Sequence, residues 1–190
     1  MAGNDEQSFP DKSRTALLLI DVINDLEFSG GEALLEKALP MADRIAELKR
    51  RAAECEVPTI YLNDNFGQWR SDFRSVVESN LKGVRGAPIV QRLVPEPDDY
   101  FVLKPKHSGF FGTTLSTLLR FLDTERLIIT GLSTEMCVLF TAMDAYMRDF
   151  ELVVPKDCCA SADQARQEAV LSYMQDVLKA DTRSSEHIEF

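Results

Sequence analysis

The stretch TALLLIDV, residues 15–22, does most to decide the fold. It is an almost continuous apolar run that reaches an acid, Asp21, near its end. A run of this kind is typical of a strand that is buried on both faces, as the strands of parallel sheets are. The stretch therefore predicts a central strand of a parallel sheet.

Outward from this strand, apolar runs and helical periodicities alternate along the chain. The patterns predict strands at 57–64, 99–105, 126–132 and 151–159, and helices at 31–55, 70–79, 113–122, 134–150 and 162–180. Pro40 is expected to start a second helical piece, and the Gly- and Pro-containing residues 80–97 a looser region. Strict alternation favours an α/β fold with right-handed crossovers. We predict a doubly wound, mostly parallel sheet of five or six strands with helices on both faces, a Rossmann-like three-layer sandwich.

Length and composition limit the class of protein. The 190 residues suit one domain, which we place at 14–190 after a disordered tail, 1–13. The net charge of −10 argues against a nucleic-acid partner. No apolar stretch approaches the roughly 20 residues of a membrane span, and the polar N-terminus lacks a signal-peptide pattern. We therefore expect a cytoplasmic protein that acts on a small molecule, without a nucleic-acid or membrane partner.

Metal and cofactor motifs are missing from the sequence. Only two histidines occur, His107 and His187, so no HExxH motif is possible. The four cysteines have no metal-ligand spacing, and neither GxGxxG after a strand nor a P-loop is present. We expect no metal and no cofactor, and we assign Cys55, Cys158 and Cys159 to packing.

Reactive side chains follow the predicted strands. Ligands of open α/β sheets bind beyond the carboxyl ends of the strands. Asp21 ends the first strand, Asn63 and Asp64 the second and Lys104 the third, and the fourth leads to Cys137. An acid, an amine and a thiol are thus expected to converge on one edge of the sheet.

Cys137 is the candidate nucleophile of this group. We place it in the first turn of a helix capped by Ser133 or Thr134, where the helix dipole and the Lys104 ammonium would favour a thiolate. Asp21 would accept the thiol proton and pass it to a leaving amine. The simpler alternatives are a packed cysteine, a loop-capping aspartate and a solvated lysine. His107 is the alternative base.

Four aromatic residues lie just past the second and third strands. We expect them to line or cover the pocket, with core packing as the alternative. They are Phe66, Trp69, Phe110 and Phe111. Arg70 and Arg74 are candidates for contact with a substrate carboxylate, with a solvated helix face as the alternative.

Three segments resemble the isochorismatase-like cysteine hydrolases, a family that includes nicotinamidases, N-carbamoylsarcosine amidases and ureidoacrylate amidohydrolases. The segments are LLLIDVINDL (17–26), FVLKPKHSGFFGTTL (101–115) and TGLSTEMCVLFTAMDAYMRDFELVVPKDCCAS (130–161). The resemblance implies catalytic roles for Asp21, Lys104 and Cys137. It also implies a cis peptide bond at Leu132–Ser133, which would aim the N–H groups of Ser133 and Cys137 at an oxyanion, and a homo-oligomer, dimer or tetramer.

Two departures from the family pattern bear on the substrate. Ile23 stands where the family often has glutamine, and the segment 63–73 lacks the histidine of a nicotinamidase metal site. We therefore expect a metal-independent hydrolase that cleaves a C–N bond of a small amide or carbamoyl compound. The alternatives are a vinyl ether hydrolase of the isochorismatase type, which needs no cysteine, and a catalytically silent assembly module.

Overall fold

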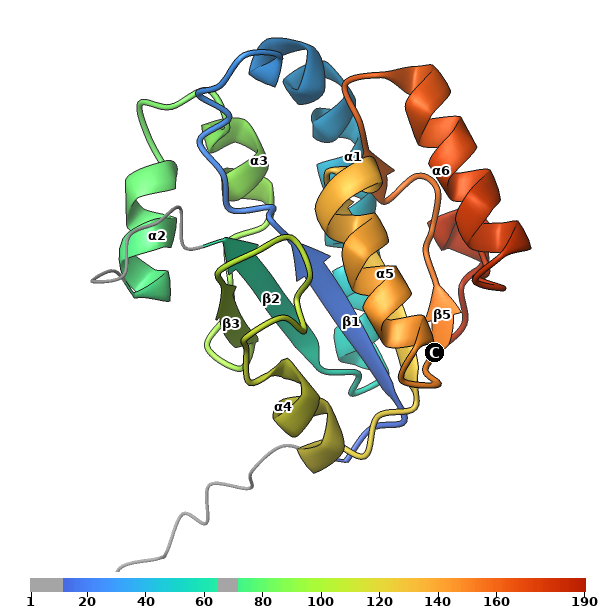
Figure 1. Ribbon diagram of the computed structural model, residues 1–190. Coiled ribbons are helices and arrows are strands. Elements are labelled where there is room, and N and C mark those ends of the chain that lie inside the picture. Colours follow the sequence, from blue (N-terminus) through green and yellow to red (C-terminus); the bar gives the residue numbers. More distant parts are fainter. Residues whose placement is uncertain (1–11, 65–71) are drawn as a thin grey trace, which may run out of the picture.

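The computed structural model describes residues 12–64 and 72–190, which form a six-stranded sheet with helices on both sides (Figure 1). The strand order is β3-β2-β1-β4-β5, β6 pairs with β4, and every paired strand is parallel to its neighbour. The strands are β1 (Thr15–Ile20), β2 (Thr59–Asp64), β3 (Tyr100–Lys104), β4 (Arg126–Leu132), β5 (Glu151–Val153) and β6 (Cys159–Ala160).

Two layers of helices cover the sheet, so the predicted doubly wound, three-layer architecture is confirmed (Figure 1). One face carries α1 (Gly31–Glu54), α2 (Phe73–Asn80) and α3 (Ala87–Arg92). The other carries α4 (Leu115–Phe121), α5 (Leu139–Tyr146) and α6 (Gln164–Asp176). A π-helical turn, η1 (Thr134–Val138), precedes α5, and a 3₁₀ turn, η2 (Ser185–His187), lies near the C-terminus.

Strand β1 lies at the centre of both cores, as its sequence predicts. All six of its residues are buried. Leu17 and Leu19 pack with α1 on one face, and Leu18 and Ile20 pack with α4 and α5 on the other. Because successive side chains of a strand point to opposite faces, a strand between two helical layers must be apolar throughout.

Proline accounts for three differences from the predicted elements. Helix α1 runs without a break through Pro40, which is exposed, so solvent can satisfy the carbonyl group that loses its partner. Helix α3, inside the region predicted to be loose, has Pro88 in its first turn, where no backbone N–H is needed. The strand predicted at 151–159 is divided into β5 and β6 across Pro155.

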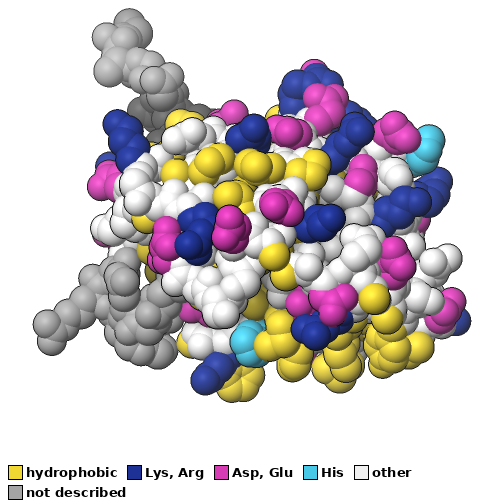
Figure 2. Space-filling model, turned by 90° about the horizontal axis from the view of Figure 1, so that it is seen from above, with side chains coloured by type: hydrophobic (Ala, Val, Ile, Leu, Met, Phe, Trp, Pro, Cys, Tyr) yellow, Lys and Arg dark blue, Asp and Glu magenta, His cyan; other side chains and the backbone are white. Residues whose placement is uncertain are grey.

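The ends of the chain and its surface add three observations. Residues 1–11 of the predicted tail lie outside the described residues, whereas Ser13 donates its N–H to the Leu122 carbonyl at 2.8 Å. Within the described chain, no helix combines the length and the apolar character needed to cross a membrane. Hydrophobic side chains gather along the lower edge of the surface in Figure 2. The exposed apolar residues of η1 and α5 are Met136, Phe140, Met143 and Tyr146.

Gly131 is required by the way β4 approaches β1. Its φ is +113°, and a Cβ at this position would overlap the backbone carbonyl oxygen of Ile20. Its N–H donates to the Cys158 carbonyl at 2.9 Å, which joins the end of β4 to the β6 segment. Gly131 therefore fixes the point at which the chain leaves the sheet and enters η1.

We predict that Gly131→Ala destabilises the fold by roughly 2–4 kcal/mol, because it combines an unfavourable φ with a backbone clash. Urea unfolding followed by circular dichroism measures the change. Gly83→Ala is the matched control: Gly83 also has a positive φ, +77°, but open space around its Cα, so its cost should be about 1 kcal/mol. Equal midpoints for the two variants would contradict the role given to Gly131.

Candidate active site

The carboxyl ends of four adjacent strands bring the predicted residues together. Asp21 directly follows β1, Asp64 and Lys104 are the last residues of β2 and β3, and Cys137 lies in η1 just after β4. The parallel register pairs Asp64 with Lys104 across β2 and β3. The predicted convergence of Asp21, Lys104 and Cys137 at this edge is therefore what the structure shows.

Lys104 is the centre of the group, and its side chain is completely buried. Its ammonium nitrogen lies 2.8 Å from Asp21 Oδ2 and 3.8 Å from Asp64 Oδ2. It also donates to the Lys106 carbonyl at 3.3 Å and to Cys137 Sγ at 3.5 Å. Burial acts to lower the pKa of this amine, but the surrounding anionic groups outweigh it and hold the pKa above its usual value. The alternative of a solvated surface lysine is wrong.

Asp21 is fixed in position by the backbone as well as by Lys104. It has a positive φ of 50° and accepts the Asp64 N–H on Oδ1 at 2.7 Å. Burial raises the pKa of its carboxyl group, and the neighbouring Lys104 ammonium opposes the rise. A carboxylate with a raised pKa, held beside a thiol, is suited to accept and return a proton.

Asn63 holds the turn after Asp21, a role that the sequence analysis did not assign. Its fully buried amide accepts the Ile23 N–H at 3.2 Å and donates to the Ile23 carbonyl at 2.7 Å. Ile23 itself is buried, so the turn is tied through its backbone. The signal available in the sequence was an amide residue near the end of an otherwise apolar strand.

Cys137 is half-buried, with Sγ 3.5 Å from the Lys104 ammonium and 3.7 Å from Nδ1 of His107. Burial and the Asp21 carboxylate raise the pKa of this thiol to about 12, and they outweigh the opposing effect of Lys104. The prediction of a lowered thiol pKa is therefore wrong for the resting site. The Asp21 carboxylate, which could accept the thiol proton, therefore also helps to keep that proton on sulfur in the resting site.

The backbone around Cys137 differs from the prediction in two respects. The described residues contain no cis peptide bond, so the expected cis bond at Leu132–Ser133 is wrong. Trans is the ordinary geometry of a non-proline peptide bond, and the chain leaves β4 through the positive φ of Gly131 before η1 begins at Thr134. Ser133 stands at the N-cap position, but its side chain makes no capping hydrogen bond.

A pocket with a volume of about 460 Å³ opens beside these groups. Its polar lining includes Asp21, Asp64, His107, Glu135 and Cys137. The remaining described lining residues are Asn24, Leu26, Phe28, Ser29, Gly30, Leu34, Leu132, Ser133, Met136 and Ala162. The nucleophile candidate and its two possible bases therefore face one cavity large enough for a small substrate.

The aromatic residues predicted to line the pocket are placed elsewhere or are not described. Phe110 is buried in the core layer beneath α4 and α5, and Phe111 is exposed; neither is among the described lining residues. An aromatic ring can pack in the core as well as line a pocket, and Phe110 packs in the core. Phe66, Trp69 and Arg70 lie outside the described residues. Arg74 lines a different pocket, with Phe73 and Phe101.

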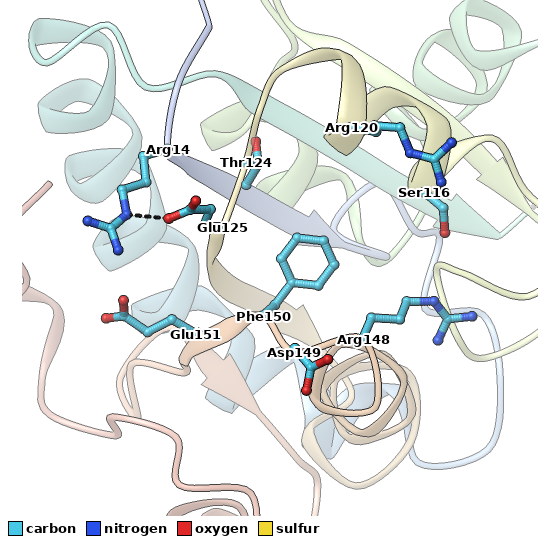
Figure 3. Close-up of a pocket in the computed structure, with 9 residues that line it drawn as sticks. All are labelled: Arg14, Ser116, Arg120, Thr124, Glu125, Arg148, Asp149, Phe150 and Glu151. Atoms are coloured by element: carbon cyan, nitrogen blue, oxygen red, sulfur yellow. Dashed lines mark ion pairs between the residues drawn. The ribbon is translucent and has the colours of Figure 1, made fainter.

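A larger pocket, of about 630 Å³, lies at the opposite edge of the sheet, near the amino ends of β1, β4 and β5 (Figure 3). Arg14 and Glu125, which lie side by side in its lining, form an ion pair at 2.8 Å. Its other charged residues are Arg120, Arg148, Asp149 and Glu151, so arginines and acids are balanced. Among the described residues, its lining contains no thiol, imidazole or lysine. The smaller pocket is therefore the candidate active site.

The other three cysteines are not among the described residues that line this pocket. Residues 12–64 and 72–190 contain no group of three or more His, Cys, Asp or Glu side chains arranged to hold a metal ion. Cys158 and Cys159 are buried, as the packing assignment predicts. Cys55 is exposed at the end of α1, so the packing assignment is wrong there.

Comparisons with known proteins agree with this fold. Residues 15–186 match the family model of the isochorismatase domain. The chain is 41% identical over 177 residues to the uncharacterized isochorismatase family protein YaaI of Bacillus subtilis, covering 93% of this chain and 97% of that protein. It is 27% identical to the ureidoacrylate amidohydrolase RutB of Methylorubrum extorquens, over 85% of this chain and 76% of the relative. The crystal structure of the nicotinamidase PncA from Bacillus subtilis superimposes with a TM-score of 0.72 at 25% identity, over 90% of this chain and 100% of the other.

We predict that Lys104→Met destabilises the protein at pH 8 by about 3–5 kcal/mol, because it leaves the Asp21 carboxylate buried without its cation. The folded-state pKa of Asp21, already raised by burial, should rise further. Protonation then favours the folded state, so the deficit should shrink as the pH falls through that pKa. Urea unfolding at pH 8 and pH 5.5 tests this. The double variant Asp21→Asn/Lys104→Met should recover part of the loss; no recovery would contradict the ion-pair account.

We also predict that Asp21→Asn shifts the alkylation of Cys137 to lower pH, because the variant removes the negative charge that raises the thiol pKa and leaves Lys104 beside the sulfur. Iodoacetamide labelling from pH 6 to pH 10, read by peptide mass spectrometry, gives the profile. Exposed Cys55 is the internal reference in every sample. An unchanged or upward-shifted profile for Cys137 would show that Asp21 does not control the thiol.

Proposed function

The chain belongs to the isochorismatase family, and we propose that it is a metal-independent cysteine hydrolase that cleaves the C–N bond of a small amide or carbamoyl compound. One observation carries the proposal. A fully buried ammonium, that of Lys104, contacts a carboxylate and a thiol, 2.8 Å and 3.5 Å away, and both Asp21 and Cys137 line the pocket. Burying a charge costs several kcal/mol unless it is paired, and perturbed groups of this kind cluster at functional sites.

The first half of the reaction transfers the acyl or carbamoyl group to sulfur. Asp21 takes the Cys137 proton as Sγ bonds to the substrate carbonyl carbon, and the carbonyl oxygen becomes an oxyanion. Backbone N–H groups of Ser133 and Cys137 are the donors that we assign to this oxyanion. When the intermediate collapses, the C–N bond breaks, Asp21 gives its proton to the leaving nitrogen, and a thioester remains.

The second half releases the product. Asp21, again ionised, removes a proton from water as the oxygen attacks the thioester carbonyl. The C–S bond then breaks, and the proton returns to sulfur, which regenerates the resting thiol. Lys104 remains charged throughout, balancing the Asp21 carboxylate before the attack and the developing charge on sulfur during it. With a thiol pKa raised to about 12, the transfer of the proton must accompany the attack.

His107 is the second candidate base, with Nδ1 3.7 Å from Sγ. Asp21 is favoured because it is buried beside Lys104, whereas the His107 ring packs at the edge of the site against Phe140, with ring centroids 5.6 Å apart. We therefore assign proton transfer to Asp21. The predicted homo-oligomer and cytoplasmic location stay predictions.

We predict that Cys137→Ala, Asp21→Asn and Lys104→Met each lower kcat/KM for amide hydrolysis by about 10³-fold or more, because each removes one member of a unit that acts together. Ammonia release from a panel of small amides and N-carbamoyl compounds is the assay. Cys55→Ser should retain full activity, since Cys55 is exposed and is not among the described residues that line the pocket. Full activity of Cys137→Ala, or pyruvate formed from isochorismate by wild type with no ammonia from any amide, would overturn the proposal in favour of vinyl ether cleavage.

A further inference from the structure

Glu135 is a buried carboxylate in the pocket wall that the proposed reaction does not use. It lies in η1, two residues before Cys137, and lines the pocket with Met136 and Cys137. Its side chain is only 17% exposed, and Oε2 is buried with no hydrogen-bond partner among the described residues. An unsatisfied buried acceptor costs about 1–3 kcal/mol, and more when it is charged. A group in this state requires an explanation.

Its ion pair with Arg166 does not supply that explanation. Arg166 Nη1 lies 3.9 Å from Oε1, which is too long for a hydrogen bond and involves the other oxygen. The arginine is 59% exposed and also lies 3.8 Å from Asp163, so solvent and a second acid weaken its attraction for Glu135. Within the described residues, Oε2 is therefore left inside the fold as an acceptor without a hydrogen-bond donor.

We propose that Glu135 is a specificity-determining residue: its carboxylate, which lines the pocket, accepts a hydrogen bond from an N–H donor of the substrate, such as an ammonium, amidinium or ureido group. The inference rests on the proposed function, since it takes the scissile carbonyl to be held at Cys137 two residues away. A rotation of the carboxylate toward the pocket on binding would let the donor satisfy the orphaned oxygen. A carboxylate placed there would instead meet a like charge in a partly desolvated wall, and such a mismatch discriminates strongly.

The rest of the pocket is consistent with a short substrate that carries one polar end. Apolar side chains supply much of the remaining lining. They are Leu26, Phe28, Leu34, Leu132, Met136 and Ala162. No Lys or Arg is among the described lining residues, so this part of the chain offers a substrate carboxylate no partner in the pocket. The substrate class that follows is a small amide bearing a neutral or cationic N–H donor.

The test measures binding rather than turnover, so that it can succeed or fail independently of the proposed reaction. The probes are 3-aminopropanamide, butanamide and succinamate, which place a cation, a methyl group and an anion at similar distances from one carboxamide. Cys137→Ala keeps Glu135 and removes the nucleophile. We expect this variant, titrated by NMR, to bind the cation about tenfold or more tightly than the anion, a difference of about 1.4 kcal/mol per tenfold.

The matched variant is Glu135→Gln in the Cys137→Ala background, which keeps the size and one acceptor but removes the charge. We expect the ratio of the two dissociation constants to fall to about threefold or less. Arg166→Gln is the control: the preference for the cation should persist or grow, whereas a merely structural Glu135–Arg166 pair would make the two variants equivalent. Urea midpoints verify that each variant is folded.

Three results would overturn the inference. They are equal binding of the three probes or no binding of any, a preference for succinamate, and an unchanged ratio in Glu135→Gln. If wild type releases no ammonia from any amide while the cation preference and its loss in Glu135→Gln are both observed, the proposed hydrolysis fails and the recognition role of Glu135 holds. The two proposals are therefore separable.

Discussion

The buried ion pair between Lys104 and Asp21 is the interaction on which the rest of this site depends. An ammonium with no solvent contact can stay charged only if acceptors surround it, and the structure supplies carboxylates from two neighbouring strand ends, one carbonyl and the Cys137 sulfur. Each acceptor comes from a different segment. The register of β1, β2 and β3 and the turn after β4 must therefore all be correct for the charge to be tolerated.

The same pair affects the thiol beside it. Lys104 alone would favour a thiolate, but burial of the site and the charge of the Asp21 carboxylate, the nearest partner of Lys104, together raise the thiol pKa. A cysteine in this state is protected from adventitious alkylation and oxidation, which proceed through the thiolate. In the proposed reaction, the thiol would react only with a bound carbonyl group, because Asp21 takes its proton in the same step in which sulfur attacks the carbonyl carbon.

The π turn gives the site its second feature. A turn wider than an α-helix places consecutive residues of η1 on the pocket wall, so that Glu135, Met136 and Cys137 all line it. The proposed nucleophile and the carboxylate that we assign to substrate recognition are therefore held by one short segment. That segment is fixed by Gly131 at one end and by α5 at the other, which couples recognition to the geometry of attack.

The sequence by itself determined the layers of the fold and the three residues of the proposed reaction. Apolar runs such as 15–20 can be satisfied only between two helical layers, and the carboxyl ends of parallel strands must meet at one edge. Asp21, Lys104 and Cys137 could be named for that reason. Helix α3 and the division of the strand at Pro155 were not predicted. A proline can begin a helix, interrupt a strand or lie in a loop, and the surrounding packing decides among these.

Tertiary structure alone decided the charges and the walls of the site. Burial of Lys104, the raised pKa of Cys137, the trans bond at Leu132–Ser133 and the core position of Phe110 each depend on what segments distant in sequence place around them. The local pattern predicted a lowered thiol pKa because it includes the helix end and the lysine but not the depth of burial. Desolvation and electrostatic coupling are properties of the assembled environment, and no short stretch of sequence contains them.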